Sequence, residues 1–243
     1  MKILLLAGTS EARDLSIALQ ARGHTVVASL AGATRAPRDL GCKMRIGGFG
    51  GEQGFRDWLA ANPVDLVIDA THPFATRISE RTARVCADEG IQCLQVRREE
   101  WSPTIDDKWN FIDEPPEANG VIEAGSRVFL ATGRQTLEQF SGLSTCYLIC
   151  RQIDPPEGPF PFSNGEFLVG RPPFSIEDEV RLFTKLKIDW LVVKNAGGEM
   201  SRSKLDAARQ LGMRVLMINR KPPPEGAIVT TVQAALDWLD AHY

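Results

Sequence analysis

The sequence lacks the features of a membrane, secreted or metal-binding protein. No apolar run approaches the roughly 18 residues of a membrane-spanning helix, and the N-terminus enters a strand-like run at once, without a signal-peptide pattern. The five cysteines include no CxxC pair, and the three histidines are far apart in the sequence. We therefore expect reduced thiols, a cytoplasmic location and no bound metal.

The sequence also lacks a strong excess of charge of either sign. Its 28 Lys and Arg residues stand against 31 Asp and Glu, which gives a formal net charge of −3. Nucleic acid is therefore not expected as a partner, and any anionic ligand has to be met by cations gathered locally. With 43% hydrophobic and 24% charged residues, the composition is that of a globular protein. We expect a monomer, because the sequence shows no coiled-coil pattern.

Three common signatures of nucleotide-binding enzymes are missing as well. The fingerprint GxGxxG does not follow the first apolar run, and the glycine cluster at 47–54 misses it because Gln53 replaces the third glycine. The absence of GxxxxGK[ST] disfavours a P-loop hydrolase. The Tyr-x-x-x-Lys pair of short-chain dehydrogenases is absent too, since Arg151 stands four residues after Tyr147 and the other tyrosine is Tyr243.

The sequence does contain a regular alternation of short apolar runs and amphipathic stretches. In the first half, strands are predicted at 2–8, 25–30, 43–46, 64–70 and 91–96. Helices are predicted at 10–22, at 55–61 and from Pro73 to Gly90. This order is typical of a Rossmann-like unit, in which a parallel sheet is wound with helices.

The alternation is lost between Arg97 and Gly125, which we interpret as a connector, and then restarts. Strands are predicted at 127–133, 146–150, 189–195 and 214–219. Helices are predicted from about Gln135, at 175–187, at 201–211 and from about Thr231. We therefore predict an α/β fold of two Rossmann-like domains with mainly parallel sheets. The expected domains are residues 1–112 and 113–243, with the active site in the cleft between them.

Four motifs directly follow predicted strands: GTSEAR (8–13), DATHPFA (69–75), ATGR (131–134) and KNAGG (194–198). In open α/β sheets, ligands bind at the carboxyl ends of the strands, where helix N-termini attract anions. Gly8 would let a ligand approach the backbone, and Arg13 lies one helical turn further on. Thr9 and Ser10 could bind phosphate oxygens, or simply cap the helix.

The end of the second predicted strand distinguishes between the two nicotinamide cofactors. An acidic side chain there binds the ribose of NAD, whereas small hydroxyls and arginine suit the 2′-phosphate of NADP. The sequence has Ser29, Thr34 and Arg35 in this region, which favours NADP, although Arg35 could equally be a solvated loop residue. Gly48 belongs to a flexible loop that would lie over the cofactor.

The remaining motifs gather polar and cationic residues at strand ends. DATHPFA places Thr71 and His72 just before a helix opened by Pro73. His72 could act as an acid, a base or a helix cap. In the second half, ATGR and KNAGG combine cations with glycines, as in a carboxylate or phosphate cradle. This pattern predicts a polyanionic small molecule as the ligand.

In this order, the four motifs resemble those of the precorrin-6A reductase family of cobalamin biosynthesis, and the resemblance covers most of the chain. It implies a two-domain Rossmann-like fold and an NADPH-dependent oxidoreductase that acts on a CH–CH group. The expected reaction reduces one macrocycle double bond of precorrin-6A to give precorrin-6B. The expected substrate is a tetrapyrrole that carries many carboxylates.

With this resemblance, the site residues divide into two sets. The residues expected to contact the cofactor are Gly8, Thr9, Ser10, Arg13, Ser29, Arg35, Gly48, Thr71, His72, Pro73 and Phe74. Those expected to contact the substrate are Thr132, Gly133, Arg134, Lys194, Asn195, Gly197 and Gly198. His72 and Lys194 are the candidate catalytic residues. Two alternatives are a non-redox two-domain tetrapyrrole enzyme, which would bind no NADPH, and an NADPH-sensing module, which would not consume it.

Overall fold

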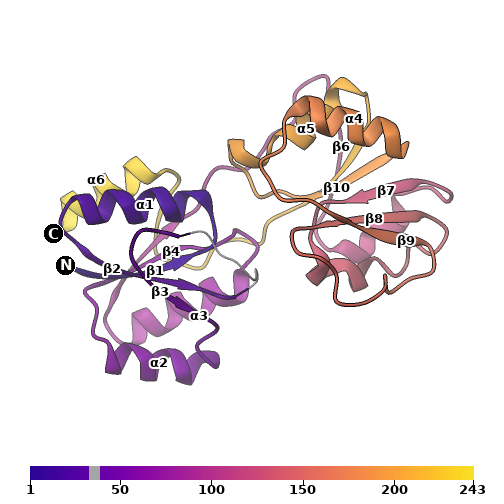
Figure 1. Cartoon of the computed structure of the whole chain (residues 1–243). Coiled ribbons are helices and arrows are strands. Elements are labelled where there is room, and N and C mark those ends of the chain that lie inside the picture. The colour runs from indigo at the N-terminus through magenta and orange to yellow at the C-terminus, as the bar shows by residue number, and fades with distance from the viewer. Residues whose placement is uncertain (33–38) are drawn as a thin grey trace. The chain divides into compact units, whose positions relative to one another are not determined.

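The computed structural model describes residues 1–32 and 39–243, which form two compact units. Unit 1 comprises Met1–Glu99 with Lys221–Tyr243, and unit 2 comprises Glu100–Arg220 (Figure 1). Each unit contains a six-stranded sheet, and all strand pairs within the described ranges are parallel. The predicted α/β fold of two Rossmann-like domains is therefore confirmed. Within the same ranges, no helix is long and apolar enough to cross a membrane.

The sheet of unit 1 has the strand order β12-β5-β4-β1-β2-β3. Its strands are β1 (Lys2–Ala7), β2 (Thr25–Leu30), β3 (Lys43–Ile46), β4 (Leu66–Ala70), β5 (Gln92–Val96) and β12 (Ala227–Val229). Helices α1 (Ser10–Ala21) and α6 (Val232–His242) cover one face, and α2 (Gly51–Ala61) and α3 (Thr76–Asp88) cover the other (Figure 1). Strands β1 and β4 are apolar throughout most of their length because both of their faces are buried.

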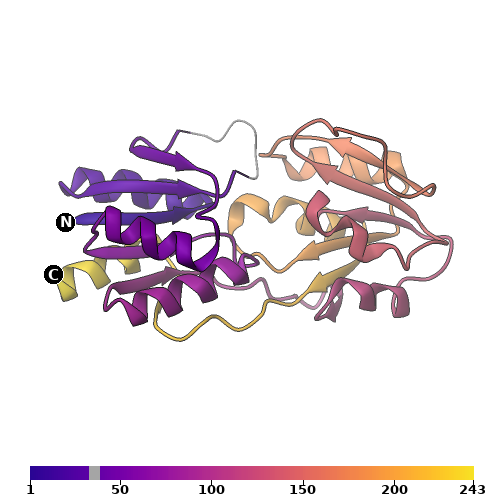
Figure 2. The same cartoon turned by 90° about the horizontal axis from the view of Figure 1, so that it is seen from below.

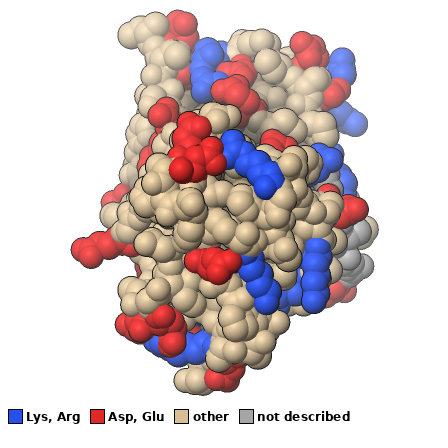
Figure 3. Space-filling model, turned by 90° about the vertical axis from the view of Figure 1, so that its left-hand side faces the viewer, with Lys and Arg blue, Asp and Glu red and all other residues tan. Residues whose placement is uncertain are grey.

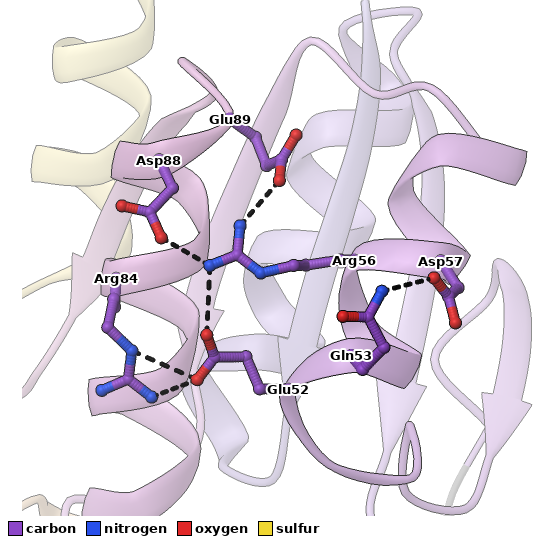
Figure 4. Close-up of polar contacts among 7 residues, drawn as sticks. All are labelled: Glu52, Gln53, Arg56, Asp57, Arg84, Asp88 and Glu89. Carbon is purple, nitrogen blue, oxygen red and sulfur yellow. Dashed lines mark hydrogen bonds and ion pairs between the residues drawn. The ribbon is translucent and has the colours of Figure 1, made fainter.

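An ion-pair network joins the two helices on the second face (Figure 4). Arg56 of α2 donates to Glu52 of its own helix and to Asp88 and Glu89 at the end of α3. Arg84 of α3 donates to the same Glu52. The hydrogen bonds from Arg84 and Arg56 lower the pKa of the Glu52 carboxyl below its usual value. The network fixes α2 against α3, and none of its members belongs to the predicted site.

The sheet of unit 2 has the order β6-β11-β10-β7-β8-β9. Its strands are β6 (Lys108–Ile112), β7 (Arg127–Leu130), β8 (Tyr147–Gln152), β9 (Gly165–Val169), β10 (Trp190–Lys194) and β11 (Arg214–Ile218). Helices α4 (Ile176–Leu186) and α5 (Ser203–Gln210) pack on one face. The 3-10 helices η1 (Pro115–Gly120) and η2 (Arg134–Phe140) lie on the other face, and η3 (Glu199–Ser201) precedes α5 (Figure 1).

The structure divides the chain differently from the predicted boundary between residues 112 and 113. Strand β6 lies in the segment interpreted as a connector, yet it pairs with β11 in unit 2. Strand β12 and helix α6 return to unit 1, where β12 pairs with β5. Figure 2 shows the C-terminal helix, in yellow, among the elements of the N-terminal unit. The sequence did not predict β6, because most of its side chains are not buried and it has no continuous apolar run. It did not predict β12, because this strand is only three residues long.

Both sheets have the Rossmann strand order 3-2-1-4-5-6, but the sixth strands are exchanged between the units. Strand β6 follows β5 in the chain and completes the sheet of unit 2, whereas β12 follows β11 and completes the sheet of unit 1. The chain therefore crosses between the units twice.

Candidate active site

All four motifs lie at the topological switch points of the two sheets. In unit 1 the strand order reverses between β1 and β4, where GTSEAR and DATHPFA begin. In unit 2 it reverses between β7 and β10, where ATGR and KNAGG begin. Ligands of doubly wound sheets bind in the crevice at such points, outside the carboxyl ends of the strands. The topology therefore gives each unit one candidate binding edge.

The turn between β1 and α1 is held by Thr9, which caps the helix. Its Oγ1 accepts a hydrogen bond from the backbone N–H of Ala12 at 3.2 Å and donates to the carbonyl of Ala70 at 2.9 Å. The predicted contact between this hydroxyl and a phosphate is therefore not favoured, since both of these interactions are internal. Gly8 lies against the turn after β4, because an added Cβ would stand 3.5 Å from the backbone nitrogen of His72.

Glu11, in the first turn of α1, brings a negative charge to the helix N-terminus. Burial raises the pKa of its carboxyl, but a backbone hydrogen bond and Arg98 outweigh that effect and lower the pKa. Arg98 donates to both carboxylate oxygens, at 3.2 and 3.0 Å. Ser10 donates to the same carboxylate at 3.2 Å, and Arg13 is exposed. Arg98 follows β5, so only the fold brings it to this turn.

The DATHPFA segment forms a turn before α3 begins. Asp69 is buried, and its Oδ1 accepts hydrogen bonds from the backbone and the hydroxyl of Thr71, at 3.0 and 2.7 Å. The sequence predicted that this helix begins at Pro73. It begins at Thr76, because residues 72–75 form the turn. The Nδ1 atom of His72 accepts from the backbone N–H of Phe74 at 3.3 Å, which places the hydrogen of the neutral ring on Nε2.

The cation at the end of β2 is Arg45, a residue that sequence reasoning missed. Arg45 of β3 is paired in register with Ser29 and donates to its hydroxyl at 2.8 Å. It also donates to the carbonyls of Gly47 and Gly48, at 3.0 and 3.1 Å. The predicted residue, Arg35, lies outside the described residues.

The aromatic ring of Phe49 completes the support of this guanidinium. The centre of the Arg45 guanidinium lies 3.8 Å from the ring centroid, a distance typical of cation–π stacking. Phe49 in turn packs edge-on against Phe55 of α2. The glycine cluster thus supports a fixed cation at the end of β2.

In unit 2, the edge after β7 and β10 contains Thr132, Gly133, Arg134 and Lys194. Thr132 is buried, whereas Arg134 is exposed at the start of η2. Gly133 has a φ of 79°, a backbone conformation that is strained for residues with a side chain. Lys194 ends β10, and burial lowers the pKa of its ammonium below the ordinary lysine value. A half-buried cation of this kind suits an anionic partner.

Asn195 has an internal role that the sequence did not predict. It is 1% exposed, and its Oδ1 accepts from the backbone N–H of Trp101 at 2.8 Å. Its Nδ2 donates to the carbonyl of Trp101 at 3.1 Å and to Glu100 at 3.2 Å. The indole of Trp101 donates to the carbonyl of Gly198 at 3.0 Å. Asn195 therefore holds the KNAGG loop against residues 100–101, so the predicted contact between its amide and a substrate is not favoured.

Comparison with known proteins identifies the chain's relatives. A family model described as precorrin-6x reductase CbiJ/CobK matches residues 2–240. The chain belongs to this family. It is similar to precorrin-6A reductase of Rhodococcus erythropolis, with 42% identity over 98% of this chain and 97% of that protein. The precorrin-6A reductase of Rhodobacter capsulatus is 38% identical over 99% of this chain and 96% of its own length.

A solved structure agrees with this membership of the precorrin-6x reductase family. The structure, described as CobK precorrin-6A reductase, superposes with a TM-score of 0.95 at 37% identity, and covers 100% of this chain and 97% of its own. The family predicted from the four motifs is confirmed, and the chain is an oxidoreductase. Among the described residues, no three His, Cys, Asp or Glu side chains gather in a way that could hold a metal ion.

Proposed function

We propose that this protein reduces one double bond of precorrin-6A with NADPH to give precorrin-6B, a step of cobalamin biosynthesis. The observation that carries this proposal is similarity along nearly the whole chain to proteins named precorrin-6A reductase. The switch-point motifs support it, because they supply one candidate binding edge for the cofactor and one for the substrate.

The end of β2 fits the 2′-phosphate of NADPH. No Asp or Glu occurs from position 29 to position 38, so the usual acidic partner of the NAD ribose is missing. The hydroxyl of Ser29 and the guanidinium of Arg45 lie within 2.8 Å of each other at this edge. Arg45 would contact the phosphate directly, since a guanidinium forms strong charge-assisted hydrogen bonds with phosphate oxygens.

The chain's own residues then orient the cofactor and supply a proton. When bound, NADPH supplies the hydride for one carbon of the double bond, and a proton has to reach the neighbouring carbon. The backbone N–H groups at the start of α1 suit the pyrophosphate. His72 and Lys194 remain the two proposed proton donors. His72 would donate as the imidazolium, a form whose Nδ1 no longer accepts from Phe74, whereas the lowered pKa of Lys194 makes its ammonium a better acid near neutral pH.

The edge of unit 2 fits the carboxylates of a tetrapyrrole. Lys194 provides a half-buried cation and Arg134 an exposed one. The backbone at Gly133, Gly197 and Gly198 has positive φ angles, which favour glycine, so no side chain covers the backbone there. A few cations at strand ends are enough to bind a polycarboxylate, even though the whole chain is slightly acidic.

The test is to mix the protein, NADPH and precorrin-6A and to follow both the nicotinamide absorbance and the mass of the product. We expect one NADPH to be oxidised for each precorrin-6A, with a product two hydrogens heavier. A non-redox tetrapyrrole enzyme would leave NADPH unchanged, and a sensing module would bind NADPH without consuming it. A parallel titration with NADH should give weaker binding than NADPH.

A further inference from the structure

In unit 2, the side chains of Gln152 and Thr132 are buried and have no hydrogen-bond partner among the described residues. Gln152 is 7% exposed, and neither its Oε1 nor its Nε2 is bonded. Thr132 is also 7% exposed, and its Oγ1 is unbonded. Burying one such group without a partner costs about 1–3 kcal/mol. A buried polar group without a partner is rare in folded proteins and calls for an explanation, such as a functional role or a bound water or ion.

Both residues belong to the carboxyl edge of the sheet. Strands β7 and β8 pair Leu130 with Cys150, and each residue follows this pair by two positions: Gln152 is the last residue of β8, and Thr132 lies in the turn after β7. Strand β10 lies on the other side of β7 and pairs Val192 with Leu130, which brings Lys194 to the same level. We call Lys194, Thr132 and Gln152 the polar row. It extends across the β7/β10 switch point.

Gln152 and Lys194 of the polar row face away from the core that α4 and α5 cover. Because side chains alternate along a strand, Gln152 and Lys194 share a face with Cys150 and Val192. Ile149 and Leu191, which precede Cys150 and Val192 and so point to the other face, belong to the core cluster beneath α4 and α5. On that opposite face Arg151 is paired with Glu179 of α4, at 2.7 Å for one of the two bonds. The fold thus pairs the charged group at the end of β8 and leaves the neighbouring neutral amide without a partner.

We propose that the polar row binds a peripheral carboxylate of the tetrapyrrole, and that Gln152 is a substrate-binding residue. This inference rests on the proposed function. The amide N–H of Gln152, the hydroxyl of Thr132 and the ammonium of Lys194 are three donors on adjacent strands, and a carboxylate offers about four acceptor sites. The amide oxygen of Gln152 accepts from a pyrrole N–H or a water molecule. The binding energy of the carboxylate offsets the cost of burying the Gln152 amide and the Thr132 hydroxyl, which have no partner among the described residues.

The Gln152→Leu variant distinguishes a role of this side chain in substrate binding from a role in folding. Losing one hydrogen bond to a charged group corresponds to a rise of about tenfold to a hundredfold in KM for precorrin-6A. The melting temperature is expected to stay the same or rise, because an apolar side chain of similar size replaces an unsatisfied amide. The NADPH dissociation constant should not change, since the proposed cofactor residues lie in unit 1. Gln210→Leu, at an exposed position on α5, is the matched control and should leave KM unchanged.

Two further variants test the chemistry of the site. Gln152→Glu keeps the shape but introduces a negative charge beside the carboxylate, so KM should rise more than in Gln152→Leu. Thr132→Val removes only a hydroxyl, and the double variant should lose less than the sum of the single losses, because both groups contact one carboxylate.

A fall of several degrees in the melting temperature of Gln152→Leu, with KM unchanged, would overturn the proposal, because the amide would then serve the fold. If Gln152→Leu does not fold, Gln152→Met replaces it. If the wild-type protein oxidises no NADPH, the proposed function fails separately, and an equilibrium titration of precorrin-6A against tryptophan fluorescence still decides between wild type and variant. Equal affinities in that titration, or no binding by either, would contradict the role of Gln152.

Discussion

The side chains of the four motifs divide according to whether the fold itself uses their polar atoms. Thr9 caps α1 and bonds to β4, Asp69 closes its own turn, and Asn195 holds the segment at Trp101. These residues shape the loops at the carboxyl edges of the sheets. Thr132 stands in contrast, since its hydroxyl has no partner among the described residues, and neither has the amide of Gln152, which lies outside the four motifs. A motif residue therefore identifies a binding edge more reliably than it identifies a ligand contact.

Arg45 provides the test of cofactor specificity. Replacing Arg45 with Met should raise the dissociation constant for NADPH about tenfold to a hundredfold, because hydrogen bonds to a charged phosphate contribute roughly 1.5–3 kcal/mol. The dissociation constant for NADH should change by less than about threefold, since NADH has no 2′-phosphate. Lys43→Met, at the start of the same strand, removes a charge from the other end of β3 and serves as the control. An equal loss of affinity for NADPH and NADH would show that Arg45 does not contact the 2′-phosphate.

Lys194 gives the protein a predictable pH dependence. Burial lowers its pKa, so between that lowered pKa and the ordinary value the unfolded chain holds a proton that the folded chain has released. The free energy of unfolding therefore rises with pH across this window, and below it the penalty of protonation is constant. Lys194→Met removes the free-energy cost of holding a protonated ammonium in this partly buried position. It should be more stable than wild type at pH 7, and the difference should shrink as the pH approaches about 10.4.

Urea unfolding between pH 7 and pH 10 measures this effect. Lys185→Met, an exposed position on α4, is the control and should follow the wild-type pH profile. A constant difference between wild type and Lys194→Met across the range would contradict the lowered pKa.

At the scale of elements, one buried ion pair joins β8 to α4. Glu179 is 1% exposed and accepts two hydrogen bonds from Arg151, whose guanidinium also lies 4.6 Å from the ring centroid of Phe129 and 4.4 Å from that of Phe174. Both charges are taken out of water, so each depends on the other. The pair sets the position of α4 at the carboxyl edge of the sheet, directly behind the polar row.

Glu179→Ala should destabilise the protein by about 3–5 kcal/mol, because it leaves a buried guanidinium without its counter-charge. Arg151→Met combined with Glu179→Leu should recover most of that loss, since neither charge is then present. Equilibrium unfolding in denaturant measures both. Glu177→Ala, two residues earlier and exposed, should cost less than about 0.5 kcal/mol. A loss of similar size in Glu177→Ala and Glu179→Ala would argue against the pair.

At the scale of the molecule, the exchange of sixth strands makes the boundary of each folded unit depend on distant parts of the chain. Unit 2 takes β6 from the segment after unit 1, and unit 1 takes β12 and α6 from the segment after unit 2. Ala235, Leu236 and Leu239 of α6 are buried in the core of unit 1 beside α1.

On the face drawn in Figure 3, Lys and Arg side chains lie among Asp and Glu, with uncharged areas between them.

Fragments of the chain test this exchange. Residues 100–220 contain all six strands of the second sheet, so this fragment should fold and show a cooperative thermal transition by circular dichroism. Residues 113–243 lack β6 and carry β12 and α6 without the sheet that covers their apolar side chains, so this fragment should aggregate or unfold without cooperativity. The reverse result would show that the unit boundary lies near residue 112.

The sequence by itself determined the fold class, the positions of most of the buried strands and the four motifs at their ends. These features are local, since apolar periodicity and turn residues follow from neighbours along the chain. The motif order, which persists along nearly the whole chain, was enough to identify the family. Only the tertiary structure decided which strands complete each sheet, because β6 and β12 are stabilised by pairing with distant strands and not by their own pattern.

The tertiary structure also decided which residues the two candidate binding edges contain. Arg45 reaches Ser29 through strand register, Arg98 reaches Glu11 from the end of β5, and the pairing of β7 with β8 brings Thr132 and Gln152 to the same edge of the sheet. None of these pairs is close in sequence, so no local pattern could reveal them. Whether a polar atom is bonded within the chain or lacks a partner depends on these non-local contacts, because burial and hydrogen bonding are properties of the packed molecule.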